Sequence, residues 1–144
     1  MVNTNLSVPN LTRLSTTLTS MSSTLDTFVK SSKPLPIAVA TSQEIRDRGS
    51  TFVASIYRAS GVASAKDAVR HHKNVVHGSH KATHEISAWR VMALKSGRDG
   101  LGGPDDFELS TGYDDDGEDY AGKRILKVLE AEGILDVVVV VSRW

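Results

Sequence analysis

Two stretches of the chain show the hydrophobic patterns that are typical of β-strands. In residues 51–57, apolar and polar faces alternate from Phe52 onward, which predicts a strand. Residues 86–94 carry apolar side chains on both faces, so we expect a central strand that is covered from both sides. The consecutive valines Val137–Val141 predict a third strand, which should lie in the interior of the sheet.

Segments with helical periodicity lie between these strands. Ser64 can cap a helix that runs to about Asn74. A second helical stripe, in residues 125–129, stops at Gly133, which can adopt the left-handed conformation beyond a helix end. Residues 96–113 are rich in Gly, Asp and Pro without a sustained period, so we expect a surface loop there. Alternating strands and helices predict an α/β fold.

The first 36 residues differ in composition from the rest of the chain. They are rich in Ser and Thr and end at the pair Pro34 and Pro36. Their apolar residues recur at helical spacing: Leu11, Leu14, Leu18, Met21, Leu25 and Phe28. Because Ser and Thr disfavour helix interiors, we expect residues 1–36 to form a flexible or partly helical tail. Residues 37–144 should form the one folded domain.

Charge and composition exclude several classes of protein. The 144 residues include 17 basic and 17 acidic side chains, so no net charge would draw the protein to nucleic acid or to an anionic membrane. The absence of cysteine excludes disulfides and thiolate ligands for zinc, and it fits a reducing compartment. No apolar run reaches the roughly 18 residues of a membrane-spanning helix, and the N-terminus lacks a secretory signal. We therefore expect a cytoplasmic protein.

Two patterns near residue 117 resemble nucleotide and calcium sites but are incomplete. Gly117 and Gly122–Lys123 match the frame of a phosphate-binding loop, yet Arg124 stands where a magnesium-binding hydroxyl is needed. An EF-hand register that places Gly117 sixth puts Gly112 first and Lys123 twelfth, where carboxylates are required. A looser divalent site stays open, but a solvated acidic loop at a helix N-terminus is the simpler interpretation.

The histidines offer a third candidate site. All five lie within residues 71–84, and His77, His80 and His84 could converge on one metal ion. Because their setting is an expected loop, nothing fixes their geometry, and we favour solvated or partner-facing imidazoles. No serine lies in the glycine elbow of a hydrolase. We therefore expect no catalytic residue, no bound metal and no cofactor, and we do not expect an enzyme.

Three blocks of residues occur in an informative order. Arg48–Ser50 leads into the first predicted strand, and Ala82–His84 leads into the central strand. The third and most specific block is Asp115–Glu118, which is followed by Ala121–Gly122 and the second helix. Together these blocks resemble the Impact family, the module shared by eukaryotic Impact proteins and bacterial YigZ-type proteins. The resemblance runs from about residue 38 to the last residue.

The resemblance carries expectations for fold and function. It implies an α+β two-layer sandwich of the ribosomal protein S5 domain 2-like superfamily, with a mixed sheet and helices packed on one face. It also implies a regulator of translation in general amino-acid control, a stress response of the cytoplasm. Eukaryotic members bind the ribosome-associated activator of the kinase that phosphorylates initiation factor two, and they restrain that kinase by competing for its activator. We thus expect a protein partner, with no membrane and no small-molecule substrate.

The resemblance also implies which residues shape the functional surface: Arg48, His84, Asp115, Asp116, Glu118 and Gly122. Each has a structural alternative. Gly122 can serve only to permit close packing, and His84 can act as scaffold by hydrogen bonding across to the acidic segment.

The chain departs from the family pattern at both ends. Family members continue past the position of Trp144 with a glycine-rich segment and a further helix, so we expect a domain that is incomplete at its C-terminus. Long eukaryotic relatives also carry an RWD domain before this module, where this chain has the Ser/Thr-rich tail. If the missing segment normally covers the valine strand, a free strand edge should favour aggregation.

Two other functions stay open. An RNA- or ribosome-contacting module is suggested by basic residues near the histidine segment: Arg70, Lys73, Lys81, Arg90, Lys95 and Arg98. A small metal-dependent enzyme that uses His84 with Asp115 or Glu118 is the less favoured alternative.

Overall fold

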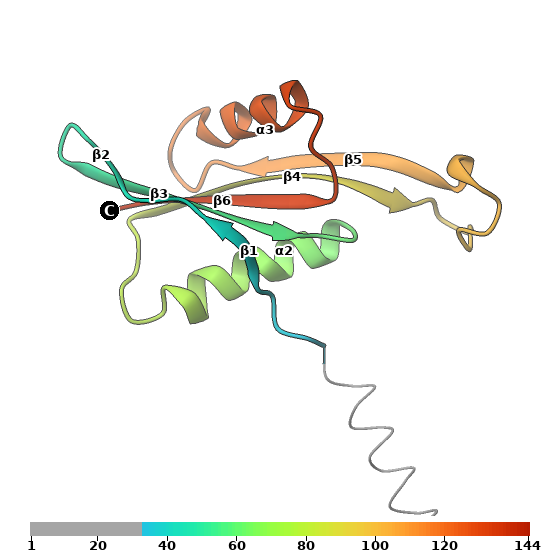
Figure 1. Ribbon diagram of the computed structural model, residues 1–144, viewed down its shortest axis with the longest axis horizontal. Coiled ribbons are helices and arrows are strands. Elements are labelled where there is room, and N and C mark those ends of the chain that lie inside the picture. Colours follow the sequence, from blue (N-terminus) through green and yellow to red (C-terminus); the bar gives the residue numbers. More distant parts are fainter. Residues whose placement is uncertain (1–32) are drawn as a thin grey trace, which may run out of the picture. The chain divides into compact units, whose positions relative to one another are not determined.

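The computed structural model describes residues 33–144, and its folded unit runs from Pro36 to Trp144 (Figure 1). The strands and helices are, in chain order, β1 (Ala38–Thr41), β2 (Ile45–Asp47), β3 (Ser50–Arg58), α2 (Val62–His71), β4 (His84–Leu94), β5 (Phe107–Asp114), α3 (Ala121–Ala131) and β6 (Val137–Arg143). Among the described residues, no helix is long and apolar enough to cross a membrane. The helix predicted within the tail lies outside the described residues, and the tail stays a prediction.

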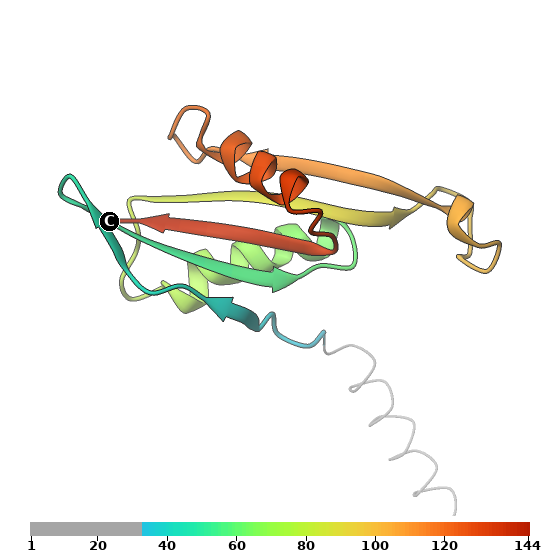
Figure 2. The same cartoon turned by 45° about the horizontal axis from the view of Figure 1, so that its top comes forward.

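The strands form one sheet in the order β1-β3-β6-β4-β5, with β2 paired to β3. The valine strand β6 lies between β3 and β4 (Figure 2). Val138 pairs with Tyr57 of β3 on one side and with Trp89 of β4 on the other. Both edges of β6 are therefore paired. The prediction of an interior valine strand is confirmed, and the free edge that would favour aggregation of this strand is not present.

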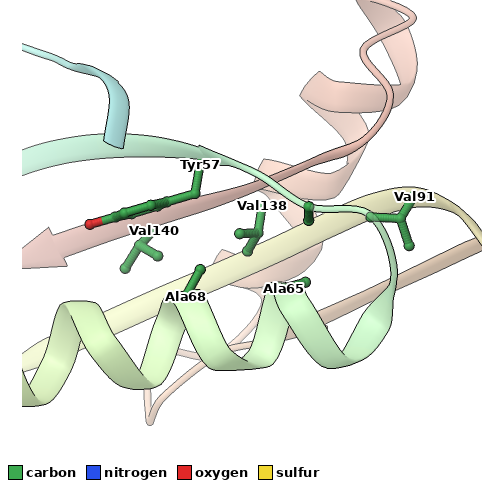
Figure 3. Close-up of a cluster of buried hydrophobic side chains, with 7 residues drawn as sticks. Tyr57, Ala65, Ala68, Val91, Val138 and Val140 are labelled. Atoms are coloured by element: carbon green, nitrogen blue, oxygen red, sulfur yellow. The ribbon is translucent and has the colours of Figure 1, made fainter. Parts of the chain in front are cut away.

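The two helices pack on opposite faces of the sheet (Figures 1 and 2). Successive side chains of a strand point to opposite faces, so the valines of β6 are shared between two apolar clusters. The α2 cluster contains Tyr57, Ala59, Ala65, Ala68, Val91, Val138 and Val140 (Figure 3). The α3 cluster contains Ala88, Leu129 and Val137, packed against Ile56, Ile125, Leu126, Ile134 and Val139.

The α+β class expected from the resemblance is confirmed, and two of its details need correction. Each strand pairing is antiparallel rather than part of a mixed sheet. The helices cover both faces rather than one. The physical reason lies in β6, where valines at both odd and even positions leave two apolar faces that each need a cover.

Helix α2 begins two residues before Ser64, the predicted cap. The Ser64 hydroxyl instead reaches back, where its Oγ accepts the backbone N–H groups of Ser60 and Gly61 at 2.9 and 3.2 Å. The helix continues as one turn of π-helix, His72–Val76, which places His72 in the core. Burial, together with the neighbouring His77 and His71, lowers the pKa of His72 to about 4, so this imidazole is neutral near pH 7.

The surface loop predicted for residues 96–113 is wrong in its second half, because Phe107–Asp114 forms the edge strand β5. Most of its residues are exposed, so the strand shows no hydrophobic period. Gly112, one of the glycines that favoured a loop, pairs with Trp89 and lies against its ring. A Cβ at Gly112 would come within 2.1 Å of Trp89 Cζ2, so the strand needs glycine at this position.

Candidate functional site

The segment from Asp114 to Gly122, which we call the acidic turn, connects the end of β5 to the start of α3. Its backbone takes positive φ angles at Asp116 (46°), Gly117 (87°) and Tyr120 (66°). Asp tolerates this conformation better than most residues, and glycine tolerates it freely. The Asp116 N–H donates to Asp114 Oδ1 at 2.9 Å, which closes the first part of the turn. The sequence therefore suits the backbone at Asp116 and Gly117, whereas Tyr120 takes a conformation that bulky side chains disfavour.

Asp115 acts on the helix that follows. Its Oδ1 accepts the backbone N–H of Gly122, in the first turn of α3, at 2.7 Å. A carboxylate at this end of a helix satisfies an otherwise unpaired N–H and interacts favourably with the helix dipole. Gly122 is buried, and a Cβ there would lie 3.0 Å from both Asp114 O and Asp115 Oδ1. Both residues thus have a scaffold role.

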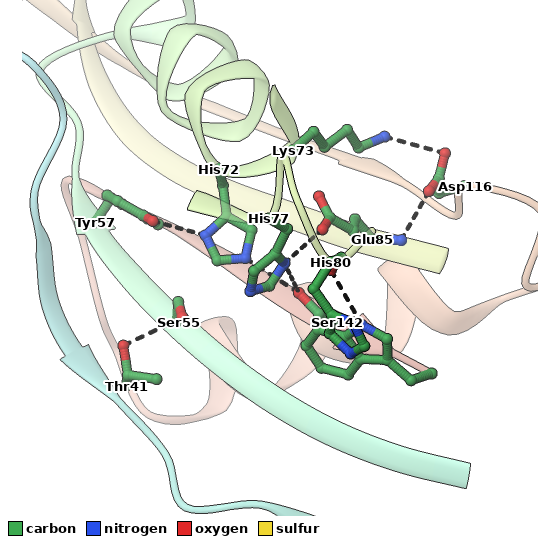
Figure 4. A network of polar contacts seen from close by, with 11 residues as sticks. Thr41, Ser55, Tyr57, His72, Lys73, His77, His80, Glu85, Asp116 and Ser142 are labelled. Atoms are coloured by element: carbon green, nitrogen blue, oxygen red, sulfur yellow. Dashed lines mark hydrogen bonds and ion pairs between the residues drawn. The ribbon is translucent and has the colours of Figure 1, made fainter. Parts of the chain in front are cut away.

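Asp116 joins the turn to the sheet and to the π-helical turn after α2 (Figure 4). Its Oδ2 accepts the backbone N–H of Glu85 at 2.7 Å, and its Oδ1 pairs with Lys73 Nζ at 3.0 Å. Strand β5 stops pairing with β4 at Ser87, so the carboxylate satisfies an N–H beyond the end of the ladder. Burial raises the pKa of Asp116, but the hydrogen bonds and the charges of Lys73 and His84 outweigh it and lower the pKa overall.

His84 lies at the centre of the turn's contacts. Its Nδ1 donates to the backbone carbonyl of Asp116 at 2.7 Å, and its Nε2 lies 3.1 Å from Glu118 Oε1. The same carboxylate oxygen also binds the Arg143 guanidinium from β6. Arg143 continues this chain of contacts, because its Nε donates to Ser50 Oγ at 3.1 Å. The acidic turn is therefore tied to the first residues of β3 and β4 and to the end of β6.

The structure brings five of the six predicted site residues together. His84, Asp115, Asp116, Glu118 and Gly122 all belong to this one set of contacts. The sixth, Arg48, lies in the turn between β2 and β3, and its side chain is 90% exposed. Its guanidinium Nε lies 3.1 Å from the carboxylate of Asp47.

The histidines are more ordered than the sequence suggested. His77 Nδ1 lies 2.7 Å from Glu85 Oε1, and His84 is held by the acidic turn, so solvated or partner-facing imidazoles are the wrong interpretation for these two residues. His77, His80 and His84 do not form a group with metal-ligand spacing in the part of the chain that the structure describes. His80 instead stacks on the ring of Trp144.

Most of the six basic residues that suggested RNA contact have partners within the protein. Ion pairs join Arg70 to Asp67, Lys73 to Asp116 and Arg98 to Asp106. Arg90 Nη1 and Lys95 Nζ donate to the backbone carbonyls of Ile134 and Asp105 at 3.1 and 2.7 Å. A phosphate backbone would have to compete with these contacts.

Two residues of the site were not singled out for it from the sequence. Arg143 is separated from Glu118 by 25 positions, and Lys73 from Asp116 by 43. Arg143 stands at the end of the valine strand, and only the register of β6 beside β4 places it opposite His84. The sequence feature that could have indicated Arg143 is a basic residue at the end of a buried strand, and this feature is too common to identify a site.

The arrangement can present a shaped surface to a partner. Asp115 and Asp116 are held by contacts within the protein, whereas Asp119 and Tyr120 are exposed, with Tyr120 at 70%. An exposed aromatic ring beside a carboxylate, on a backbone fixed from several sides, suits recognition by contact because little ordering is needed on binding. This exposed pair sits at the N-terminus of α3.

Comparison with known proteins identifies the module. Residues 48–144 match the Impact N-terminal domain. The protein IMPACT homolog of Saccharomyces cerevisiae is 37% identical over 105 residues, which cover 72% of this chain and 36% of that protein. The structure of the two-domain translational regulator Yih1 is similar with a TM-score of 0.53 and 30% identity, covering 79% of this chain and 42% of that one.

A second solved structure, of a protein described only as hypothetical, has a TM-score of 0.53 at 28% identity and covers 76% of this chain and 48% of that one. The chain therefore spans less than half the length of each of these three relatives. The family match covers the acidic turn and its partners on β3, β4 and β6. On this match, the chain belongs to the family of the Impact N-terminal domain.

Proposed function

We propose that this protein regulates translation by binding a protein partner through the acidic turn, without catalysing a reaction. The observation that carries the proposal is the set of contacts from His84, Lys73 and Arg143, which fix the turn while Tyr120 stays exposed. The family supports the direction of the proposal, since a related structure is that of a translational regulator.

The finer form of the proposal names the pathway. The protein acts in general amino-acid control in the cytoplasm, where it competes for the ribosome-associated activator of the kinase that phosphorylates initiation factor two. Competition of this kind needs complementary charge and shape and no bond chemistry. The exposed carboxylate of Asp119 favours a basic surface on the partner.

An extract from amino-acid-starved cells tests both forms. Purified protein added to the extract should lower the phosphorylation of initiation factor two in a dose-dependent way, and affinity capture should retain the activator. Asp119→Lys combined with Tyr120→Ala should abolish both effects, because these side chains form the proposed contact surface. Both are exposed, so their replacement should leave the turn intact.

The matched control is Glu130→Lys, an identical change of charge at an exposed position near the other end of α3. It should act like the unmodified protein. Unchanged phosphorylation together with no capture of the activator would reject the pathway. Equal activity of the Asp119→Lys/Tyr120→Ala variant and the unmodified protein would reject the acidic turn as the binding surface.

A further inference from the structure

A second cluster of polar side chains lies on the α2 face of the sheet (Figure 4). His72, His77 and Glu85 each offer a ligand atom, and these atoms all lie within 4.8 Å of one another. His72 and Glu85 are 1% and 4% exposed, so the cluster is part of the interior. Apart from the backbone N–H of Glu85, this cluster shares nothing with the contacts of the acidic turn.

Two segments, the π-helical turn after α2 and strand β4, bring these side chains together. The π-helical turn His72–Val76 ends with a bond from the His77 N–H to the His72 carbonyl, which places the two imidazole rings 4.3 Å apart. Glu85 comes from β4, where the register places it opposite Ser142 of β6. Single π-turns at the end of an α-helix are frequent at functional sites, and this one is what directs His77 back toward the sheet.

The hydrogen bonds orient the imidazole nitrogens toward the centre of the cluster. Tyr57 Oη lies 2.6 Å from His72 Nδ1, and this contact leaves His72 Nε2 facing Ser142 Oγ at 3.1 Å. His77 Nδ1 lies 2.7 Å from Glu85 Oε1 and 3.4 Å from Ser142 Oγ. A histidine that ligates a metal commonly has its other ring nitrogen fixed by such an outer hydrogen bond. His72 has this arrangement through Tyr57.

Glu85 gives the independent observation. Its Oε2 is buried and has no hydrogen-bond partner among the described residues. An unpaired carboxylate oxygen in the interior is costly, and native proteins rarely leave one without a compensating group. The cluster therefore combines two imidazoles with a buried carboxylate that has one unpaired oxygen, which is a ligand set that a cation completes.

We propose that His72, His77 and Glu85 bind one divalent transition-metal ion of the zinc class. Two imidazoles and a carboxylate suit zinc and its first-row neighbours, whereas magnesium and calcium prefer oxygen ligands alone. In a tetrahedral zinc site the ligand atoms lie roughly 3.3 Å apart. His77 Nδ1 and Glu85 Oε1, now 2.7 Å apart, would separate slightly, and any wider pair, none above 4.8 Å, would draw together. The Ser142 hydroxyl or a water molecule takes the fourth position.

The bound ion links the end of α2 to the central strand β4. It therefore stabilises the face of the sheet opposite α3, and its positive charge pairs with the buried carboxylate of Glu85. Binding to the folded state alone raises stability in proportion to the logarithm of the free metal concentration.

Calorimetric titration of the chelator-treated, full-length protein with Zn²⁺ tests the proposal, together with thermal unfolding at each metal level. We expect one ion per chain and a rise of Tm on addition of zinc. Glu85→Gln and His77→Gln should each weaken binding by at least about tenfold, the effect commonly seen for lost groups at metal sites. His80→Gln, a change of the neighbouring exposed histidine, should bind zinc like the unmodified protein.

Quenching of tryptophan fluorescence by Co²⁺ tests whether the ion binds at this cluster. The Trp144 ring lies 5.0 Å from that of His77, so bound Co²⁺ should quench its fluorescence, and Trp144→Phe should remove most of this quenching because only Trp89 remains. This measurement decides the matter in the unmodified chain if the ligand variants fail to fold. Absence of zinc uptake, or uptake with unchanged Trp144 fluorescence on adding Co²⁺, would show that the cluster is only an internal hydrogen-bond network.

Discussion

At the scale of single residues, His84 explains most of the site. The sequence indicated that it approaches the acidic turn, because both blocks carry the family resemblance, and the bonds to Asp116 and Glu118 bear this out. The sequence did not indicate Arg143, which reaches Glu118 only through the register of β6. Five of the six motif residues lie together as the resemblance implied, Arg48 lies apart from them, and the partners supplied by strand pairing could not be predicted.

Asp115 should contribute to stability through α3. Asp115→Ala removes the acceptor for the Gly122 N–H, so the free energy of unfolding should fall by about 1 kcal/mol, as for other helix caps. Urea denaturation followed by circular dichroism measures the change. Asp119→Ala, at an exposed position of the same turn, should alter stability much less. Equal losses in the two variants would contradict the capping role.

Asp116 should make stability depend on pH in the acid range. Its pKa in the folded protein is lowered below the ordinary value of 3.8, so its contribution is complete above that value and is lost as pH falls through the folded-state pKa. The difference in free energy of unfolding between the unmodified protein and Asp116→Asn should therefore shrink from about pH 6 to about pH 2. A constant difference over this range would contradict the lowered pKa of Asp116 in the folded protein.

At the scale of elements, the valine strand organises the molecule. Its hydrophobic run predicted an interior strand correctly, since β6 is paired on both edges and covered on both faces. The edge strand β5 was missed because exposure removes the hydrophobic pattern and because Gly112 is required by the Trp89 ring. The sequence therefore predicted the buried strand β6, but it did not predict the exposed edge strand β5, whose residues lack a hydrophobic pattern.

The importance of β6 can be measured with one pair of variants. Val140 is fully buried in the α2 cluster, so Val140→Ala should lower the free energy of unfolding by about 2 kcal/mol, from lost burial and the cavity left behind. Val128 on α3 is 59% exposed, and Val128→Ala should change the same quantity by less than about 0.5 kcal/mol. Chemical denaturation of both variants would reveal any failure of this contrast.

At the scale of the whole molecule, most of the basic side chains that suggested RNA contact have ion-pair or hydrogen-bond partners within the protein. The net formal charge is zero, and three of the residues that suggested RNA contact are paired with carboxylates. We therefore expect weak binding to single-stranded RNA even at low salt. Fluorescence anisotropy with a labelled RNA measures this, and tight binding that declines steeply between low and moderate salt would favour the ribosome-contacting alternative.

We propose that the acidic turn is the surface by which this protein binds a protein partner. The most direct test is the Kd for the purified ribosome-associated activator, measured for the unmodified protein, Asp119→Lys/Tyr120→Ala and Glu130→Lys. We predict that Kd rises at least about tenfold in the double variant and stays unchanged in Glu130→Lys, because contact residues at a binding surface carry most of its energy. Equal affinity of all three proteins for the activator would contradict the claim.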